Sequence, residues 1–286
     1  MQVEKNLIVK GAAERDMAVD VFYEGGERRP VVIYAHGFNG FKDWANFDLV
    51  AERFIAAGFT FIKFNFSHNG TTPAHPEDFV DLDAFGKNNY SKQLEDLEKI
   101  ITWTCANENP FADNIDAGKL SLIGHSMGGG IVLLQASVDP RVSKVVTWAS
   151  VSECKTPWGG WPAKKLEEWK KEGVQYYTNT RTNQQMPLFY QLFEDYTTNA
   201  EKLDIKKAME RIQVPVLVIH GQSDISVPIE NAYELISWRP ETKLFTLDTD
   251  HVFDRRHPWL GSTLPRAMEI VIAETFRFLK DEYEPA

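Results

Sequence analysis

Ser126 lies in the stretch GHSMGG, residues 124–129, where glycines on both sides make this serine a candidate nucleophile. One apolar run ends just before this stretch and another begins just after it, which predicts a buried strand at 119–125 and a helix at 127–138. Such a tight turn forces Ser126 into a strained backbone conformation and brings strand and helix close together, so Gly124 and Gly128 avoid steric overlap. At a helix N-terminus the dipole favours developing negative charge. The pattern predicts a nucleophile elbow.

A phosphate-binding loop and a simple packing turn are the alternatives for the same stretch. The sequence carries no G-K-[ST] after these glycines and no G-x-G-x-x-G register. Both alternatives are therefore weaker than the nucleophile.

The elements that must position Ser126 form a regular series. Short β-branched or aromatic runs alternate with helical patterns, which indicates a mostly parallel, doubly wound sheet with helices on both faces. The expected strands are 30–36, 59–66, 119–125, 142–149, 215–221 and 242–248, and the expected helices are about 44–57, 88–106, 127–138, 228–237 and 265–281. Two further runs before Pro30 predict an antiparallel pair at one sheet edge.

One interruption breaks this series. The gap between the strand ending near Ser150 and the strand opening at Pro215 is far longer than a βαβ crossover needs. We therefore expect an α/β core at 1–150 and 213–286, and an inserted helical cap at 151–212.

Composition narrows the class of protein. The chain has 286 residues, 43% of them hydrophobic, and a formal net charge of −10, which disfavours nucleic acid and anionic membranes as partners. The two cysteines, Cys105 and Cys154, lack metal-site or scaffold spacing. No stretch predicts a signal peptide or a membrane span, so we expect a soluble, cytoplasmic protein.

The chain resembles the α/β-hydrolase family from about Pro30 to its end. The motifs HGFNG (36–40), GHSMGG (124–129), GQSD (221–224) and DH (250–251) follow the family order. The resemblance implies Ser126 as nucleophile, Asp224 as the acid that orients the base, and His251 as the base. His257 is the rival base, and Asp248, Asp250 and Glu153 are rival acids.

The same family implies an oxyanion hole made by the backbone N–H groups of Phe38 and Met127. Substrate-binding residues are harder to assign. Trp158, Trp161 and Tyr190 of the insertion are expected at the substrate wall, although its aromatic residues suit the insertion's own core equally well.

The turn NFSHNGTT (65–72) resembles feruloyl- and cinnamoyl-esterase-like hydrolases. We therefore expect a serine esterase that cleaves a neutral, small to medium carboxylic ester through an acyl-enzyme, without metal or organic cofactor. Acyl-peptide (aminopeptidase-like) or thioester hydrolysis is the alternative, and a silent ligand-binding fold is a weaker one. The oligomeric state stays open.

Overall fold

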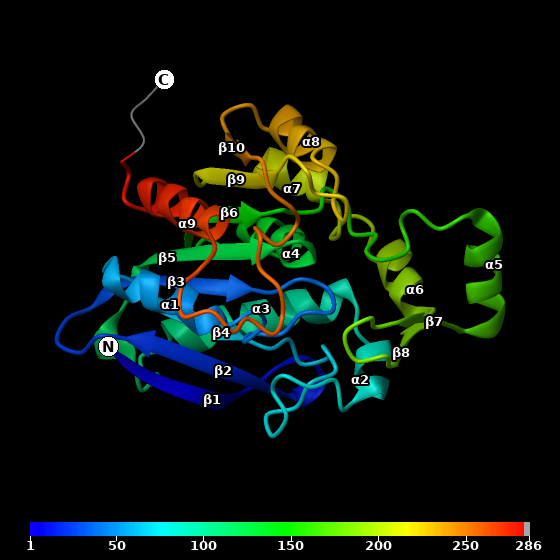
Figure 1. Ribbon diagram of the computed structural model, residues 1–286, viewed down its shortest axis with the longest axis horizontal. Helices are drawn as coiled ribbons and strands as arrows, with labels where there is room; N and C mark the ends of the chain where they lie inside the picture. The colour runs from blue at the N-terminus through cyan, green and yellow to red at the C-terminus, as the bar shows by residue number, and fades with distance from the viewer. Residues whose placement is uncertain (283–286) are drawn as a thin grey trace.

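The structure, a computed structural model, describes residues 1–282 and is built around one large sheet (Figure 1). Its eight strands lie in the order β1-β2-β4-β3-β5-β6-β9-β10. They are β1 (Gln2–Lys10), β2 (Asp16–Tyr23), β3 (Arg29–Ala35), β4 (Thr60–Phe64), β5 (Ile115–His125), β6 (Val142–Trp148), β9 (Val216–Gly221) and β10 (Lys243–Leu247). The expected strands are all present, and β5 begins four residues earlier than the sequence predicts.

The sheet is parallel from β4 to β10, and β1 and β2 form the expected antiparallel pair at its edge. Alternate residues of the central strands enter two separate cores. In β3, Val31 and Ile33 belong to one hydrophobic cluster, and Val32 and Tyr34 belong to the other. Both faces are buried, which explains why the strands read as continuous apolar runs.

Helices cover the two faces unequally. Residues of α3, α4, α7 and α8 fill one cluster, and residues of α1 and α9 fill the other. The helices of these layers are α1 (Phe47–Ala56), α3 (Tyr90–Cys105), α4 (Met127–Ala136), α7 (Ile205–Arg211), α8 (Glu230–Trp238) and α9 (Arg266–Leu279). The short helix α2 (Leu82–Gly86) lies at one side of the molecule, beneath the inserted segment (Figure 1). None of the helices among residues 1–282 has the length and apolar character to cross a membrane.

The sequence predicts a helical cap between β6 and β9, but the structure shows that this segment also contains strands. It holds α5 (Ala163–Glu172), α6 (Gln191–Thr198) and a hairpin of β7 (Val174–Thr178) and β8 (Gln185–Phe189). These two strands pair antiparallel with each other and form a sheet of their own. The β-branched and aromatic residues of VQYYT favour a strand, and this local preference explains why the stretch is not helical.

The two ends of this segment behave differently. Helix α7 contacts α4 and α8 and therefore belongs to the helical layer of the core, not to a separate cap. The rest projects to the side (Figure 1) and docks on α2 and the start of α3. There Gln191 donates to the carbonyls of Gly86 and Asn88, and Asp195 accepts the Ser91 amide.

Candidate active site

Ser126 occupies the turn that joins β5 to α4, as the sequence predicts. Its φ of 56° and ψ of −121° lie in a region that residues other than glycine rarely adopt. A Cβ atom at Gly124 would overlap the Gly128 carbonyl, and a Cβ atom at Gly128 would overlap the Ala35 carbonyl. The close approach of strand and helix therefore requires both glycines, and it holds the strained serine in place.

His251 and Asp224 meet beside this turn although 27 residues separate them in the chain. Asp224 follows β9 and His251 follows β10, so both lie beyond the carboxyl ends of neighbouring parallel strands. The His251 Nδ1 atom is 2.7 Å from Asp224 Oδ2. If Nδ1 carries the proton that Asp224 accepts, the Nε2 atom is left free to take a proton from a hydroxyl group.

The surroundings of Asp224 favour its ionised form. Its Oδ1 atom accepts the amides of Ser226 and Val227, each at 2.8 Å. Burial opposes ionisation, but hydrogen bonds from His220 and His251 outweigh it and hold the pKa of Asp224 well below its ordinary value. A carboxylate in this state can orient an imidazole and stabilise its protonated form.

A second histidine, His125, supports the loop that carries His251. Its Nε2 atom is 2.9 Å from the His251 carbonyl oxygen, which can only accept, so Nε2 must carry the proton. Burial lowers the pKa of His125 well below its ordinary value, and the ring therefore stays neutral. His125 is thus a structural donor and is not placed to act as the base.

The rival base His257 has a different environment. Its Nδ1 atom accepts the Ala45 amide at 3.0 Å, and its ring stacks on Trp44. Unlike His251, it lines neither of the two cavities at Ser126. Asp224 is the described carboxylate that bonds His251. Of the rival acids, Asp250 accepts amides of its own loop, Asp248 accepts the Ser223 hydroxyl, and Glu153 lines the outer cleft but pairs with Lys155.

Two backbone amides next to Ser126 are available to a ligand. Met127 is the first residue of α4, and Phe38 follows Gly37, where a Cβ atom would lie 2.9 Å from the Ser126 Cβ. Within residues 1–282, neither the Phe38 nor the Met127 amide donates a hydrogen bond to another group. Donors left free at a helix N-terminus and in an adjacent loop can bind a negatively charged oxygen.

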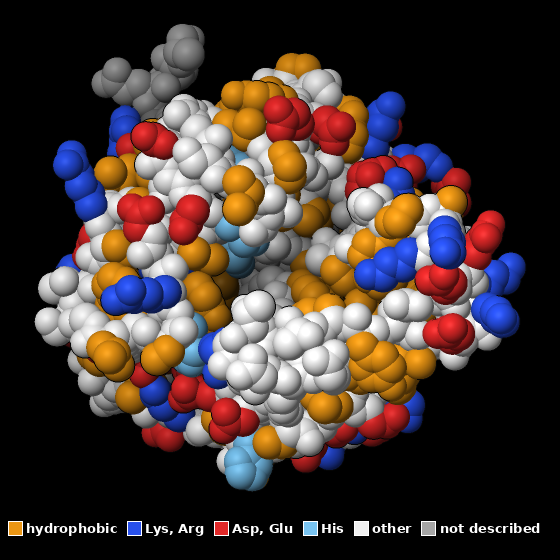
Figure 2. All heavy atoms as spheres, turned by 45° about the vertical axis from the view of Figure 1, so that its right-hand side comes forward, with side chains coloured by type: hydrophobic (Ala, Val, Ile, Leu, Met, Phe, Trp, Pro, Cys, Tyr) orange, Lys and Arg blue, Asp and Glu red, His pale blue; other side chains and the backbone are white. Residues whose placement is uncertain are grey.

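Two cavities meet at Ser126. The inner cavity, of about 190 Å³, extends toward Tyr34, Trp44 and Arg255. The outer cleft, of about 600 Å³, extends toward Pro157 and Tyr177 of the inserted segment. The residues that line both are Phe38, Asn39, Ser126 and His251. Figure 2 shows the surface hollowed here, with histidine and hydrophobic side chains at the wall.

The structure does not bring Trp158, Trp161 and Tyr190 to either cavity. Trp158 contacts Phe193 at a ring distance of 5.0 Å, and both Trp161 and Tyr190 pack edge-on against Trp169. The three residues therefore belong to the aromatic core of the inserted segment, which is the alternative that composition left open. Tyr177 is its aromatic contribution to the outer cleft, and no sequence pattern singled it out.

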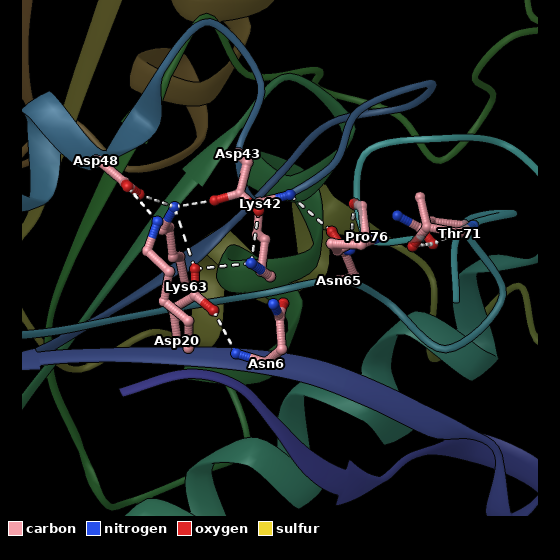
Figure 3. A network of polar contacts seen from close by, with 11 residues as sticks. Asn6, Asp20, Lys42, Asp43, Asp48, Lys63, Asn65, Thr71 and Pro76 are labelled. Carbon is pink, nitrogen blue, oxygen red and sulfur yellow. Dashed lines mark hydrogen bonds and ion pairs between the residues drawn. The ribbon is translucent and has the colours of Figure 1, made fainter. Parts of the chain in front are cut away.

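The loop that carries Phe38 is anchored by a buried group of charges, here called the lysine–aspartate cluster: Asp20, Lys42, Asp43, Asp48 and Lys63 (Figure 3). Lys42 Nζ lies 2.7 Å from Asp20 and 2.5 Å from Asp43. Lys63 Nζ bonds Asp43 and lies 2.5 Å from Asp48 and 3.3 Å from Asp20. The cluster ties the loop after β3 to β2 and β4.

The three aspartates of this cluster are the set of described carboxylates close enough together to hold a metal ion. Each of the three is already bonded by one or both of the ammonium groups of Lys42 and Lys63, and both of these lysines are fully buried. Lys5 pairs with Asp48 as a third cation, so three ammonium groups face three carboxylates. The arrangement is that of a charge-balanced structural network, because each buried charge has an opposite partner.

A family model described as the alpha/beta hydrolase fold matches residues 30–172, half of the 286 residues. The chain belongs to the α/β-hydrolase family. The match covers the strands from β3 to β6 and the elbow at Ser126, and it confirms the fold that the sequence motifs predict.

Two relatives share part of this α/β hydrolase. The quorum-quenching protein AidA of Acinetobacter baumannii (strain MDR-ZJ06) is 29% identical over 118 residues, which cover 41% of this chain and 34% of that protein. An uncharacterized 31.7 kDa protein from the traX-finO intergenic region of Escherichia coli is 30% identical over 124 residues, 43% of this chain and 38% of that protein. The similarity thus spans little more than a third of either relative.

Solved structures resemble this α/β hydrolase over nearly its whole length. A putative hydrolase from Agrobacterium vitis S4 has a TM-score of 0.72 at 19% identity and covers 98% of this chain and 99% of its own. Est1E from Butyrivibrio proteoclasticus, also solved with ferulic acid bound, has a TM-score of 0.67 at 15% identity with the same coverage. At these identities the likeness is one of fold.

Proposed function

We propose that this α/β hydrolase is a serine esterase that cleaves a small to medium carboxylic ester through an acyl-enzyme. The observation that carries the proposal is the 2.7 Å contact between His251 Nδ1 and an ionised Asp224, in a cavity wall that His251 shares with the strained Ser126. These are the parts that acyl transfer needs.

In the proposed first step, His251 Nε2 takes the hydroxyl proton while Ser126 Oγ forms a bond to the ester carbonyl carbon. The negative charge that develops on the carbonyl oxygen is bound by the Phe38 and Met127 amides. The carbon–oxygen bond of the ester breaks, and His251 gives its proton to the departing alcohol. In the second half of the reaction, His251 takes a proton from water while the water oxygen attacks the acyl carbon. The bond from that carbon to Ser126 Oγ then breaks, His251 returns the proton to Ser126, and the carboxylic acid leaves.

The proposed role of the inserted segment is to limit the length of the acyl or alcohol group that fits in the outer cleft. Residues 151–204 supply Pro157 and Tyr177 to its wall, and the Asn179 side chain donates to Asn39 next to Phe38 at 3.3 Å. Such a wall favours esters of limited length over long-chain lipids.

The similarity to AidA, named a quorum-quenching protein, and to Est1E supports a small-molecule substrate for this chain. A fluorophosphonate probe should label the wild type and not Ser126→Ala, and a panel of carboxylic esters should be hydrolysed by the labelled protein. Failure of the probe to label the folded wild type would refute the serine mechanism. Faster cleavage of thioesters or aminoacyl anilides than of every ester would replace the esterase with that class.

A further inference from the structure

Arg255 lies four residues after His251, and only 3% of it is exposed. Its Nε atom donates to the Val252 carbonyl at 3.1 Å. The buried Nη1 atom has no hydrogen-bond partner among the described residues. Arginine keeps its positive charge in proteins, so this side chain holds a buried guanidinium with unused donors.

No described carboxylate pairs with this cation. Asp250, in the same loop, is turned to the amides of Val252 and Asp254, each at 3.0 Å from its Oδ1 atom. The rings of Trp44 and Phe47 lie 5.6 and 5.1 Å from the guanidinium carbon and stabilise the charge in part. A buried cation is nevertheless unfavourable unless an anion completes its surroundings.

The anion would have to come from the inner cavity, because Arg255 lines it together with Ser126 and His251. Tyr34 of β3 lines the same cavity, and its hydroxyl group makes no hydrogen bond to any residue from 1 to 282. A guanidinium with an unpaired Nη1 atom and an unpaired phenol thus border one small space. Both are donors that suit a carboxylate.

We infer that the inner cavity binds a carboxylate carried by the acyl part of the substrate, and that the substrate class is the monoester of a short dicarboxylic acid. The inference rests on the proposed esterase function and makes it more specific. A volume of about 190 Å³ admits a short chain. The net charge of −10 suggested a neutral ester, but the local cation outweighs that distant field once the substrate is bound.

The test compares two esters of nearly the same shape, monomethyl glutarate and the methyl ester of glutaric acid monoamide, by methanol release. In wild type, kcat/KM should be about 10- to 100-fold higher for the carboxylate than for the amide, chiefly through KM. Arg255→Gln should remove most of that preference, and Tyr34→Phe should reduce it by several-fold. The adjacent exposed Arg256 offers the matched control, since Arg256→Gln should leave the preference unchanged.

An equal rate on both esters in wild type would overturn the inference, as would an unchanged preference in Arg255→Gln. If Arg255→Gln does not fold, inhibition of the wild type tests the inference instead. Glutarate should inhibit cleavage of a neutral ester competitively, with an inhibition constant at least about tenfold lower than that of butyrate. Equal inhibition by both acids would overturn the inference. An enzyme that reacts with the fluorophosphonate and cleaves neutral esters without this preference retains the proposed function, whereas absence of probe labelling refutes that function itself.

Discussion

Two sets of buried cations in this molecule differ in how their charges are balanced. In the lysine–aspartate cluster, Lys42 and Lys63 are each bonded to two or more carboxylates. Arg255 is equally buried and has none among the described residues. The two lysines thus have all their anionic partners within the protein, whereas Arg255 would gain one only from a ligand in the inner cavity.

This difference indicates that the lysine–aspartate cluster stabilises the fold and that Arg255 serves ligand binding. A buried charge with all its partners stabilises one arrangement of the chain, whereas an unpartnered one lowers stability and is a candidate for ligand recognition. Changes at the cluster should therefore reduce the free energy of unfolding, and changes at the cavity should reduce activity.

The largest effect is expected for Ser126→Ala. Loss of the nucleophile should lower kcat by about 10⁶-fold in a triad enzyme. The fold should survive, because the strained turn is held by Gly124, Gly128 and the elements around it. Steady-state kinetics measures the loss of kcat, and urea unfolding of the same preparation shows whether the fold survives. Residual turnover above a few per cent of wild type would exclude Ser126 as nucleophile.

His251→Ala should lower kcat almost as far, about 10⁵- to 10⁶-fold, because the serine then lacks its base. The matched variant is His257→Ala, which loses a contact to the Ala45 amide and should change kcat by at most about tenfold. If His257→Ala proved the more damaging of the two in the kinetics, the assignment of the base would be wrong.

The free energy of unfolding should depend more strongly on the lysine–aspartate cluster than on Arg255. Lys63→Met leaves Asp20 and Asp43 with Lys42 as their remaining cation, and Asp48 with Lys5. The buried negative charge is then compensated only in part, and the free energy of unfolding should fall by about 3–5 kcal/mol. Arg255→Met leaves no carboxylate without a cation and should change the free energy of unfolding by less than about 1 kcal/mol. Urea unfolding at neutral pH measures both, with Lys119→Met as an exposed control. Equal losses for Lys63→Met and Arg255→Met would break the comparison.

A smaller effect should appear in acid. Burial raises the pKa of Asp43 and Asp48, but Lys63 outweighs it and lowers both below their ordinary value of 3.8. A lowered pKa in the folded state means that the stabilisation is complete above that ordinary value and is lost as the pH falls through the folded pKa. Wild type should therefore lose unfolding free energy between about pH 5 and pH 2 more steeply than Lys63→Met. Parallel pH curves would contradict this account of the cluster.

The sequence by itself determined the strands of the mostly parallel sheet and the elbow at Ser126, and its resemblance to the α/β-hydrolase family implied the pairing of Asp224 with His251. Each follows from local rules: apolar runs of strand length, glycines where backbones must touch, and the convergence of parallel strand ends at one sheet edge. The catalytic roles of these residues stay predictions until the variants above are measured.

Only the tertiary structure decided which aromatic and charged side chains face the cavities. Trp158, Trp161 and Tyr190 pack against other aromatic residues of the inserted segment, while Tyr177 reaches the outer cleft. Nothing in the sequence distinguishes Arg255 from the exposed Arg256 beside it. Burial and pairing of a side chain depend on residues brought from distant parts of the chain, and local periodicity carries no record of them.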